Sequence, residues 1–169
     1  MELPIQFDNL NSKDIDDLKI TLRESSKVSI AAASFSIYAY EALKEEVEAI
    51  EELRFIFTSP TFCKERGYKE KREFFIPKLN RERNLFGSDF KINLRNQLSQ
   101  RAIARECADW IRRKACFKTN VSNGALNGFL SVANDEGKCV YLPFNEFTTT
   151  ELGCERGNNI CHVSMRMPS

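Results

Sequence analysis

Residues 27–57 read KVSIAAASFSIYAYEALKEEVEAIEELRFIF, and this stretch decides the fold class. Its first part, residues 27–35, is an apolar run of small side chains that suits a strand buried on both faces. In the middle part, apolar side chains recur at helical spacing: Leu43, Val47 and Ile50. Residues 53–57 predict a second strand. A strand, a helix and a strand within about 30 residues form a βαβ unit, so we expect two parallel, adjacent strands in an α/β protein.

The chain on both sides of this unit predicts further helices. Residues 11–25 and residues 96–114 both carry apolar side chains at helical spacing. Residues 90–95 alternate between apolar and polar side chains, which predicts a strand with one exposed face. We therefore expect helices to flank the sheet.

The C-terminal part of the sequence changes to a period of two. Three short runs, separated by turn residues at 122–124 and 134–137, predict strands joined by hairpin-type turns. The strands around Phe129 and Tyr141 should be antiparallel to one another, which makes the predicted sheet mixed. We expect the core to contain Ile30, Leu43, Phe55, Ile103, Trp110, Phe129 and Val140.

Length and charge indicate a single domain without a global attraction to polyanions. The chain has 169 residues, of which 42% are hydrophobic, and this suffices for one core. We place the domain at residues 1–157 and expect a poorly ordered tail at 158–169. Its 25 Lys and Arg are balanced by 24 Asp and Glu. The polar N-terminus lacks a signal sequence and no stretch approaches about 18 apolar residues, which predicts a cytoplasmic protein that does not engage membranes.

The sequence does not predict a metal, a cofactor or a nucleotide site. The six cysteines include no CxxC pair, so we expect reduced, mostly buried thiols rather than zinc ligands or disulfides. They are Cys63, Cys107, Cys116, Cys139, Cys154 and Cys161. Glu146, Glu151 and Glu155 lack an accompanying His or Asp cluster, which indicates solvated or helix-capping carboxylates. The glycines form neither a GxGxxG nor a P-loop pattern.

Two segments joined by the long helix resemble a known family. They are VSIAAASFSIYAYEALKEEVEAIEELRFIF at residues 28–57 and ALNGFLSVANDEGKCVYLPFNEFTTTELG at residues 125–153. In their order and spacing they resemble a phospholipase D-like domain of the kind fused N-terminally to bacterial DEAD/DEAH or Swi/Snf-type helicases. The resemblance covers roughly residues 15–157 and implies a mixed β-sheet flanked by helices.

The resemblance also locates the positions that carry chemistry in the family. Residues 126–130, LNGFL, take the place of the His-x-Lys strand, so Asn127 and Phe129 stand where the histidine and lysine are expected. Residues 144–152 resemble the Ser-Asn-containing turn, with Asn145 in it. The family needs one imidazole to attack phosphorus, a lysine to hold phosphoryl oxygens and a second imidazole to protonate the leaving group. An amide is not a nucleophile at neutral pH, and a phenyl ring cannot balance the charge of a phosphate.

The absence of this histidine and lysine does not depend on how the chain is aligned with the family. His162 is the only histidine of the chain, and Lys138 is the only lysine between residues 119 and 169. We interpret His162 as a surface histidine on the C-terminal tail. The sequence therefore predicts a degenerate phosphodiesterase site, with an atypical phosphodiesterase or nuclease as an alternative.

Local basic patches leave nucleic acid open as a partner. Residues 63–84 carry eight basic and four acidic side chains interleaved with aromatic ones, and basic residues also end the long helix. The candidate DNA contacts are Lys69, Lys71, Arg72, Arg81, Arg83, Arg112 and Arg113. Both patches can equally be solvated faces that nearby glutamates balance.

The function expected from the sequence is that of a catalytically degenerate phospholipase D-like accessory domain of a helicase-type protein. It would contribute DNA binding or assembly. The chain holds no Walker motif, so the helicase motor would lie in another domain or another chain. The alternative is a protein-interaction domain that forms a homodimer without binding DNA, which an apolar patch on the face that holds Asn127 and Phe129 would favour.

Overall fold

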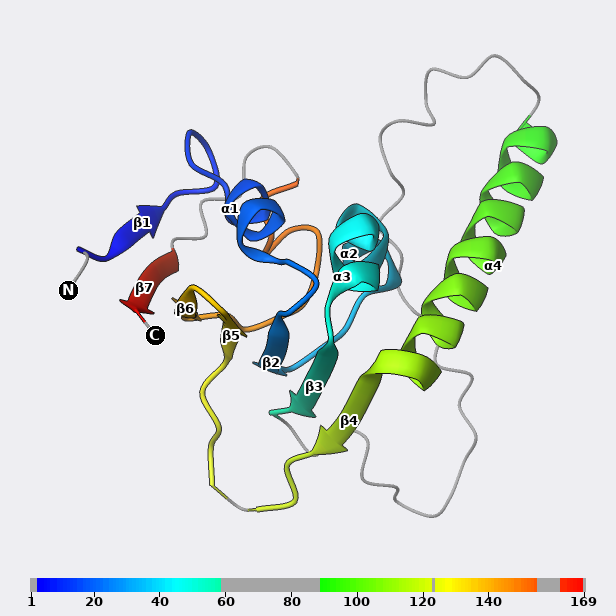
Figure 1. Ribbon diagram of the computed structural model, residues 1–169. Helices are drawn as coiled ribbons and strands as arrows, with labels where there is room; N and C mark the ends of the chain where they lie inside the picture. Colours follow the sequence, from blue (N-terminus) through cyan, green and yellow to red (C-terminus); the bar gives the residue numbers. More distant parts are fainter. Residues whose placement is uncertain (1–2, 59–88, 123, 155–161, 169) are drawn as a thin grey trace.

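A computed structural model describes residues 3–58, 89–122, 124–154 and 162–168, which form a mixed β-sheet flanked by helices (Figure 1). In sheet order the strands are β1 (Ile5–Phe7), β7 (His162–Pro168), β6 (Gly137–Leu142), β5 (Phe129–Asn134), β2 (Lys27–Ala32), β3 (Glu52–Phe57) and β4 (Ala115–Thr119). The helices are α1 (Asp14–Thr21), α2 (Ile37–Ala42), α3 (Lys44–Ala49) and α4 (Asp89–Lys114). The predicted α/β class is confirmed.

The βαβ unit forms as the sequence predicts. Strands β2 and β3 are adjacent and parallel, with Ile30 paired to Phe55. The helix between them is divided at Leu43 into α2 and α3. Ser36 begins α2, because its hydroxyl accepts a hydrogen bond from the backbone N–H of Tyr38 at 3.2 Å and so satisfies one free donor of the first turn.

Only one of the two predicted hairpins is present. Strands β5 and β6 are antiparallel, with Leu130 paired to Tyr141, as expected. Strand β4 instead pairs in parallel with β3, where Phe117 lies beside Phe55. The aromatic rings of these two residues stack with centroids 5.1 Å apart, so the apolar side chains of β4 extend the core at the edge of the sheet.

The strand predicted at residues 90–95 is wrong, because these residues lie within α4. The alternation of apolar and polar side chains there covers only six positions. No glycine or proline interrupts the chain between Asp89 and Lys114, so nothing in the sequence ends a helix over this range.

The core lies between the helices and one face of the sheet. All four described helices contribute buried side chains to it, and the contacts around its centre are made by Leu18, Leu43, Val47 and Trp110 against Val28, Ile30, Leu53 and Leu130. The predicted core positions Ile30, Leu43, Phe55 and Trp110 are buried there, and Ile103 packs against them partly buried.

Phe129 and Val140 were expected in the core but lie on the second face of the sheet. Strand side chains alternate between faces, and Leu130 and Tyr141 take the core-facing positions. Phe129 and Val140 are half-buried. The second sheet face carries Phe129, Val140, Leu142, Val163, Met165 and Met167.

The expected poorly ordered tail is wrong for residues 162–168, which form β7. This strand pairs antiparallel with both β6 and β1, so it lies inside the sheet (Figure 1). Its alternate residues His162 and Ser164 are buried, which ties the C-terminal part to the core. The position of the proposed domain boundary at 157 falls outside the described residues.

Two further sequence expectations concern membranes and thiols. Within the described ranges, no helix combines the length and the apolarity needed to cross a bilayer. Cys107 and Cys139 are buried, as expected, whereas Cys116 and Cys154 are exposed. Cys63 and Cys161 lie outside the described residues.

Candidate functional site

The structure gathers the three sequence-predicted site positions at one end of the sheet. Asn127 and Phe129 flank Gly128 at the start of β5, and Asn145 follows the end of β6. The carbonyl of Gly128 accepts a hydrogen bond from the N–H of Phe144 at 3.1 Å, which brings the two segments together. We call Asn127, Phe129 and Asn145 the strand-end site.

Close backbone packing fixes this arrangement. A Cβ atom at Gly128 would lie 2.1 Å from the carbonyl oxygen of Phe144, so only glycine fits without a shift of the backbone. The carbonyl of Asn145 accepts from the N–H of Ala33 at 2.8 Å, and the N–H of Phe147 donates to Ser34 at 3.0 Å. The segment after β6 is thereby held against the end of β2 as well.

The side chains at the strand-end site offer two amides and a phenyl ring. Asn127 and Asn145 are exposed, and Phe129 is half-buried on the second sheet face. Lys138 lies near the beginning of β6, at the other end of that strand. The site thus presents hydrogen-bonding groups but neither a nucleophile nor a cation to hold a phosphoryl oxygen.

His162 is buried, so its interpretation as a surface histidine is wrong. Its side chain is 0% exposed, and Nδ1 is paired with Oδ2 of Asp14 while Nε2 lies 3.1 Å from Oε1 of Glu151. Burial lowers the pKa of His162, but the hydrogen bonds and charges of the two carboxylates outweigh burial and raise that pKa to about 9. The imidazole is therefore protonated at neutral pH.

Glu151 is also buried, which corrects its expected role as a solvated carboxylate. Its Oε1 accepts from the backbone N–H of Asn145 at 2.8 Å in addition to its contact with His162. Its carbonyl accepts from the side-chain amide of Asn9 at 3.0 Å, and Oδ1 of Asn9 accepts from the N–H of Asp14 at 3.1 Å. These groups form a ring of hydrogen bonds, which Glu151 connects to Asn145 of the strand-end site.

The network of Asn9, Asp14, Glu151 and His162 holds three chain segments together. It links the loop before α1, the turn after β6 and the start of β7. Because His162 has no exposed surface, it cannot contact a substrate in this arrangement. The period of two in residues 162–168, with His162, Ser164 and Arg166 alternating with apolar residues, is the signal that identifies β7 in the sequence.

Basic residues at the end of α4 are engaged by acidic or carbonyl partners. Arg112 pairs with Asp109 at 2.8 Å, and Arg113 pairs with Glu48 at 3.0 Å. Nζ of Lys114 donates to the carbonyl of Ile50 at 2.7 Å, beyond the end of α3. These partners offset the positive charges at the C-terminal end of α4. The other candidate DNA contacts lie outside the described residues: Lys69, Lys71, Arg72, Arg81 and Arg83.

Acidic groups in the described part of the chain do not assemble with His or Cys into a set of three that could hold a metal ion. Glu146 is exposed, and Glu155 falls outside the described residues. The carboxylates of Asp14 and Glu151 contact opposite ring nitrogens of His162, so the imidazolium lies between them.

Comparison with known proteins returned structural likeness only. No protein-family model matches the chain, and no curated protein matches its sequence. The structure of yeast tyrosyl-DNA phosphodiesterase aligns with a TM-score of 0.46 and 14% identity, over 98% of this chain and 32% of that one. A mutant of the same enzyme aligns with a TM-score of 0.47 and 14% identity, over 98% and 31%. This chain thus spans about a third of the length of these structures.

Proposed function

We propose that this chain is a catalytically inactive, phospholipase D-like accessory domain of a helicase-type protein, which contributes DNA binding or assembly. The observation that carries the proposal is the strand-end site. Close packing around Gly128 brings Asn127, Phe129 and Asn145 to one end of the sheet, yet none of them can attack phosphorus. The helicase association and the family assignment rest on the sequence resemblance.

The position of His162 supports the absence of catalysis. A nucleophilic imidazole has to be neutral and has to reach the substrate. His162 is protonated at neutral pH, is 0% exposed and contacts a carboxylate on each ring nitrogen. Withdrawing it would leave the carboxylates of Asp14 and Glu151 buried without a cation, which is costly.

DNA binding would fall mainly to the basic segment of residues 63–84. The helix end contributes less in this proposal, because Arg112 and Arg113 already have acidic partners. Each phosphate that a basic side chain neutralises releases counterions and adds about −0.9 to the slope of log affinity against log salt. Three contacts would therefore give a slope near −3 on duplex DNA.

A salt series with fluorescently labelled duplex DNA tests this function by anisotropy. We expect weak binding by the native protein. Lys71→Glu combined with Arg72→Glu should reduce the slope of log affinity against log salt by about 2. Arg112→Glu combined with Arg113→Glu is the matched control and should change the slope less. Absence of binding at about 50 mM salt, or an unchanged slope in the first double variant, would remove DNA from the proposal.

Assembly is the second candidate, and the second sheet face favours it. Met165 and Met167 are 46% and 50% exposed, and Met165 is paired with half-buried Val140 on the neighbouring strand. Exposed apolar side chains gathered on one face are typical of interaction surfaces. Sedimentation velocity would show a dimer that Met165→Glu dissociates. A protein that stays monomeric at high concentration would exclude self-association through this face.

A further inference from the structure

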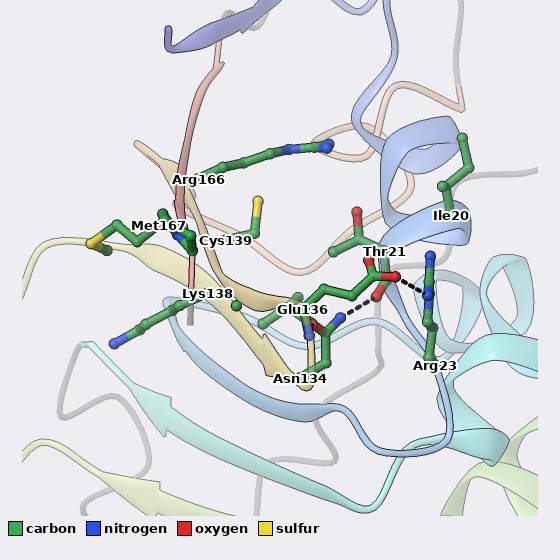
Figure 2. A pocket seen from close by; sticks show the side chains of 12 residues that line it. Ile20, Thr21, Arg23, Asn134, Glu136, Lys138, Cys139, Arg166 and Met167 are labelled. Atoms are coloured by element: carbon green, nitrogen blue, oxygen red, sulfur yellow. Dashed lines mark hydrogen bonds and ion pairs between the residues drawn. The ribbon is translucent and has the colours of Figure 1, made fainter. Parts of the chain in front are cut away.

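A cavity of about 360 Å³ opens between the end of α1 and the β5–β6–β7 part of the sheet (Figure 2). It lies at the end of β5 and the beginning of β6, and thus at the opposite end of these strands from the strand-end site. Its volume falls within the range of roughly 300–1,000 Å³ that small-molecule sites occupy. The polar side chains among its lining residues belong to Thr21, Arg23, Asn134, Glu136, Lys138 and Arg166.

Arg166 is held in place from one side only. Figure 2 shows its side chain extending from β7 toward α1, and there its Nη2 donates to Oδ1 of Asp17 at 2.5 Å. The other carboxylate oxygen of Asp17 accepts from the hydroxyl of Tyr141, also at 2.5 Å. This chain of contacts fixes the guanidinium group. Burial lowers the pKa of Arg166, but the charge of Asp17 outweighs it and the pKa is raised, so the group remains a cation.

The donors of Arg166 are incompletely used. Guanidinium has five N–H donors, and only Nη2 has an acceptor among the described residues. Nε is buried and has no hydrogen-bond partner there. The side chain as a whole is 37% exposed and lines the cavity. An oxyanion is the partner that best suits the guanidinium donors that remain accessible.

A second cation faces the same cavity. Arg23 forms an ion pair with Glu136 at the rim (Figure 2), and the two side chains are 51% and 66% exposed. Ion pairs at this exposure contribute little, so Arg23 can exchange Glu136 for a bound anion. Asn134 joins the two sides of this rim. Its side-chain amide donates to the carbonyl of Thr21 at 3.1 Å, and its side-chain oxygen accepts from the N–H of Glu136 at 3.0 Å.

We propose that this cavity binds the oxyanion group of a small molecule, a phosphate or a carboxylate, between Arg166 and Arg23. The site is separate from the strand-end site and independent of the proposed DNA binding. A site of one or two charge-assisted hydrogen bonds should bind a simple anion with a Kd in the millimolar range.

Titration of the ¹⁵N-labelled full chain followed by NMR tests the site, with inorganic phosphate in one series and succinate in the other. We expect saturable shifts of the backbone amides of Thr21, Asn134 and Arg166. The anion that binds more tightly identifies the class of ligand. An absence of saturable shifts with both anions, or shifts that map elsewhere, would overturn the proposal.

Variants at the rim distinguish binding from a structural role. Glu136→Gln frees Arg23 and should tighten binding about threefold, a gain that a merely structural ion pair would not produce. Asp135→Asn removes the same charge from the neighbouring exposed residue, which does not line the cavity, and should have less effect. Arg166→Lys keeps a cation beside Asp17 but loses the planar donors, so binding should weaken about tenfold. If Glu136→Gln binds no more tightly than Asp135→Asn, Arg23 does not contact the anion.

Discussion

Removing the charge of His162 should change how the stability of the protein depends on pH. The imidazolium is enclosed with Asp14 and Glu151, and it joins β7 to α1 and to the turn after β6. His162→Gln keeps a polar side chain of similar size but cannot carry the positive charge. The two carboxylates would then share a buried site without a cation, which costs about 3–5 kcal/mol in comparable sites.

The size of the pH effect follows from the pKa of His162. That pKa rises from 6.5 to about 9 on folding, and at about 1.4 kcal/mol per pH unit this contributes about 3 kcal/mol to the free energy of unfolding. Because the folded-state pKa is the higher one, the contribution is complete below pH 6.5. It is lost as the pH rises through about 9.

Urea unfolding followed by circular dichroism at pH 6, 7.5 and 9 would measure the effect. Between pH 6 and pH 9 the free energy of unfolding of the native protein should fall by about 3 kcal/mol relative to that of His162→Gln. If the glutamine variant does not fold, Glu151→Gln provides the same test, because it keeps an acceptor oxygen but removes one of the two negative charges beside His162. Equal pH slopes in the native protein and in the variants would refute a charged, buried His162.

Three other substitutions test the packing around the sites. Gly128→Ala should lower the free energy of unfolding by about 1–3 kcal/mol, because its Cβ would lie 2.1 Å from the carbonyl oxygen of Phe144; a stability equal to that of the native protein would mean that the two segments are not in contact. Trp110→Phe should cost about 1–3 kcal/mol, since its indole N–H donates to the carbonyl of Val47 at 2.8 Å, and calorimetry would show this as a lower Tm. Ser36→Ala removes the N-cap of α2 and should cost about 1 kcal/mol in urea unfolding; no loss at all would argue against the cap.

The sequence predicts those parts of the fold that depend on neighbouring residues. The parallel pair β2–β3 follows from the βαβ periodicity of one continuous segment, and the antiparallel pair β5–β6 follows from a short turn between two strands. The face that each strand turns to the core is less predictable. In β5, FLSVAN has apolar side chains on both faces, and only the helices decide that Leu130 rather than Phe129 is buried.

The buried network behind the strand-end site could not be predicted from local pattern. Asp14 and His162 are 148 residues apart in the sequence, and they meet only because β7 inserts between β1 and β6. A lone histidine near a chain end has no local feature that indicates two carboxylate partners. That Asn127 and Phe129 mark a degenerate site stays a prediction, which rests on residue types alone because neither side chain is an imidazole or a lysine.

The central claim, that the strand-end site does not catalyse phosphodiester cleavage, is tested most directly by a turnover assay. Purified protein would be incubated with single-stranded DNA, duplex DNA and an aryl phosphodiester, with and without a chelator. We expect no turnover above the blank in any of these reactions. Turnover that persists through purification and disappears in His162→Gln or Asn145→Ala, while those variants remain folded, would contradict the claim.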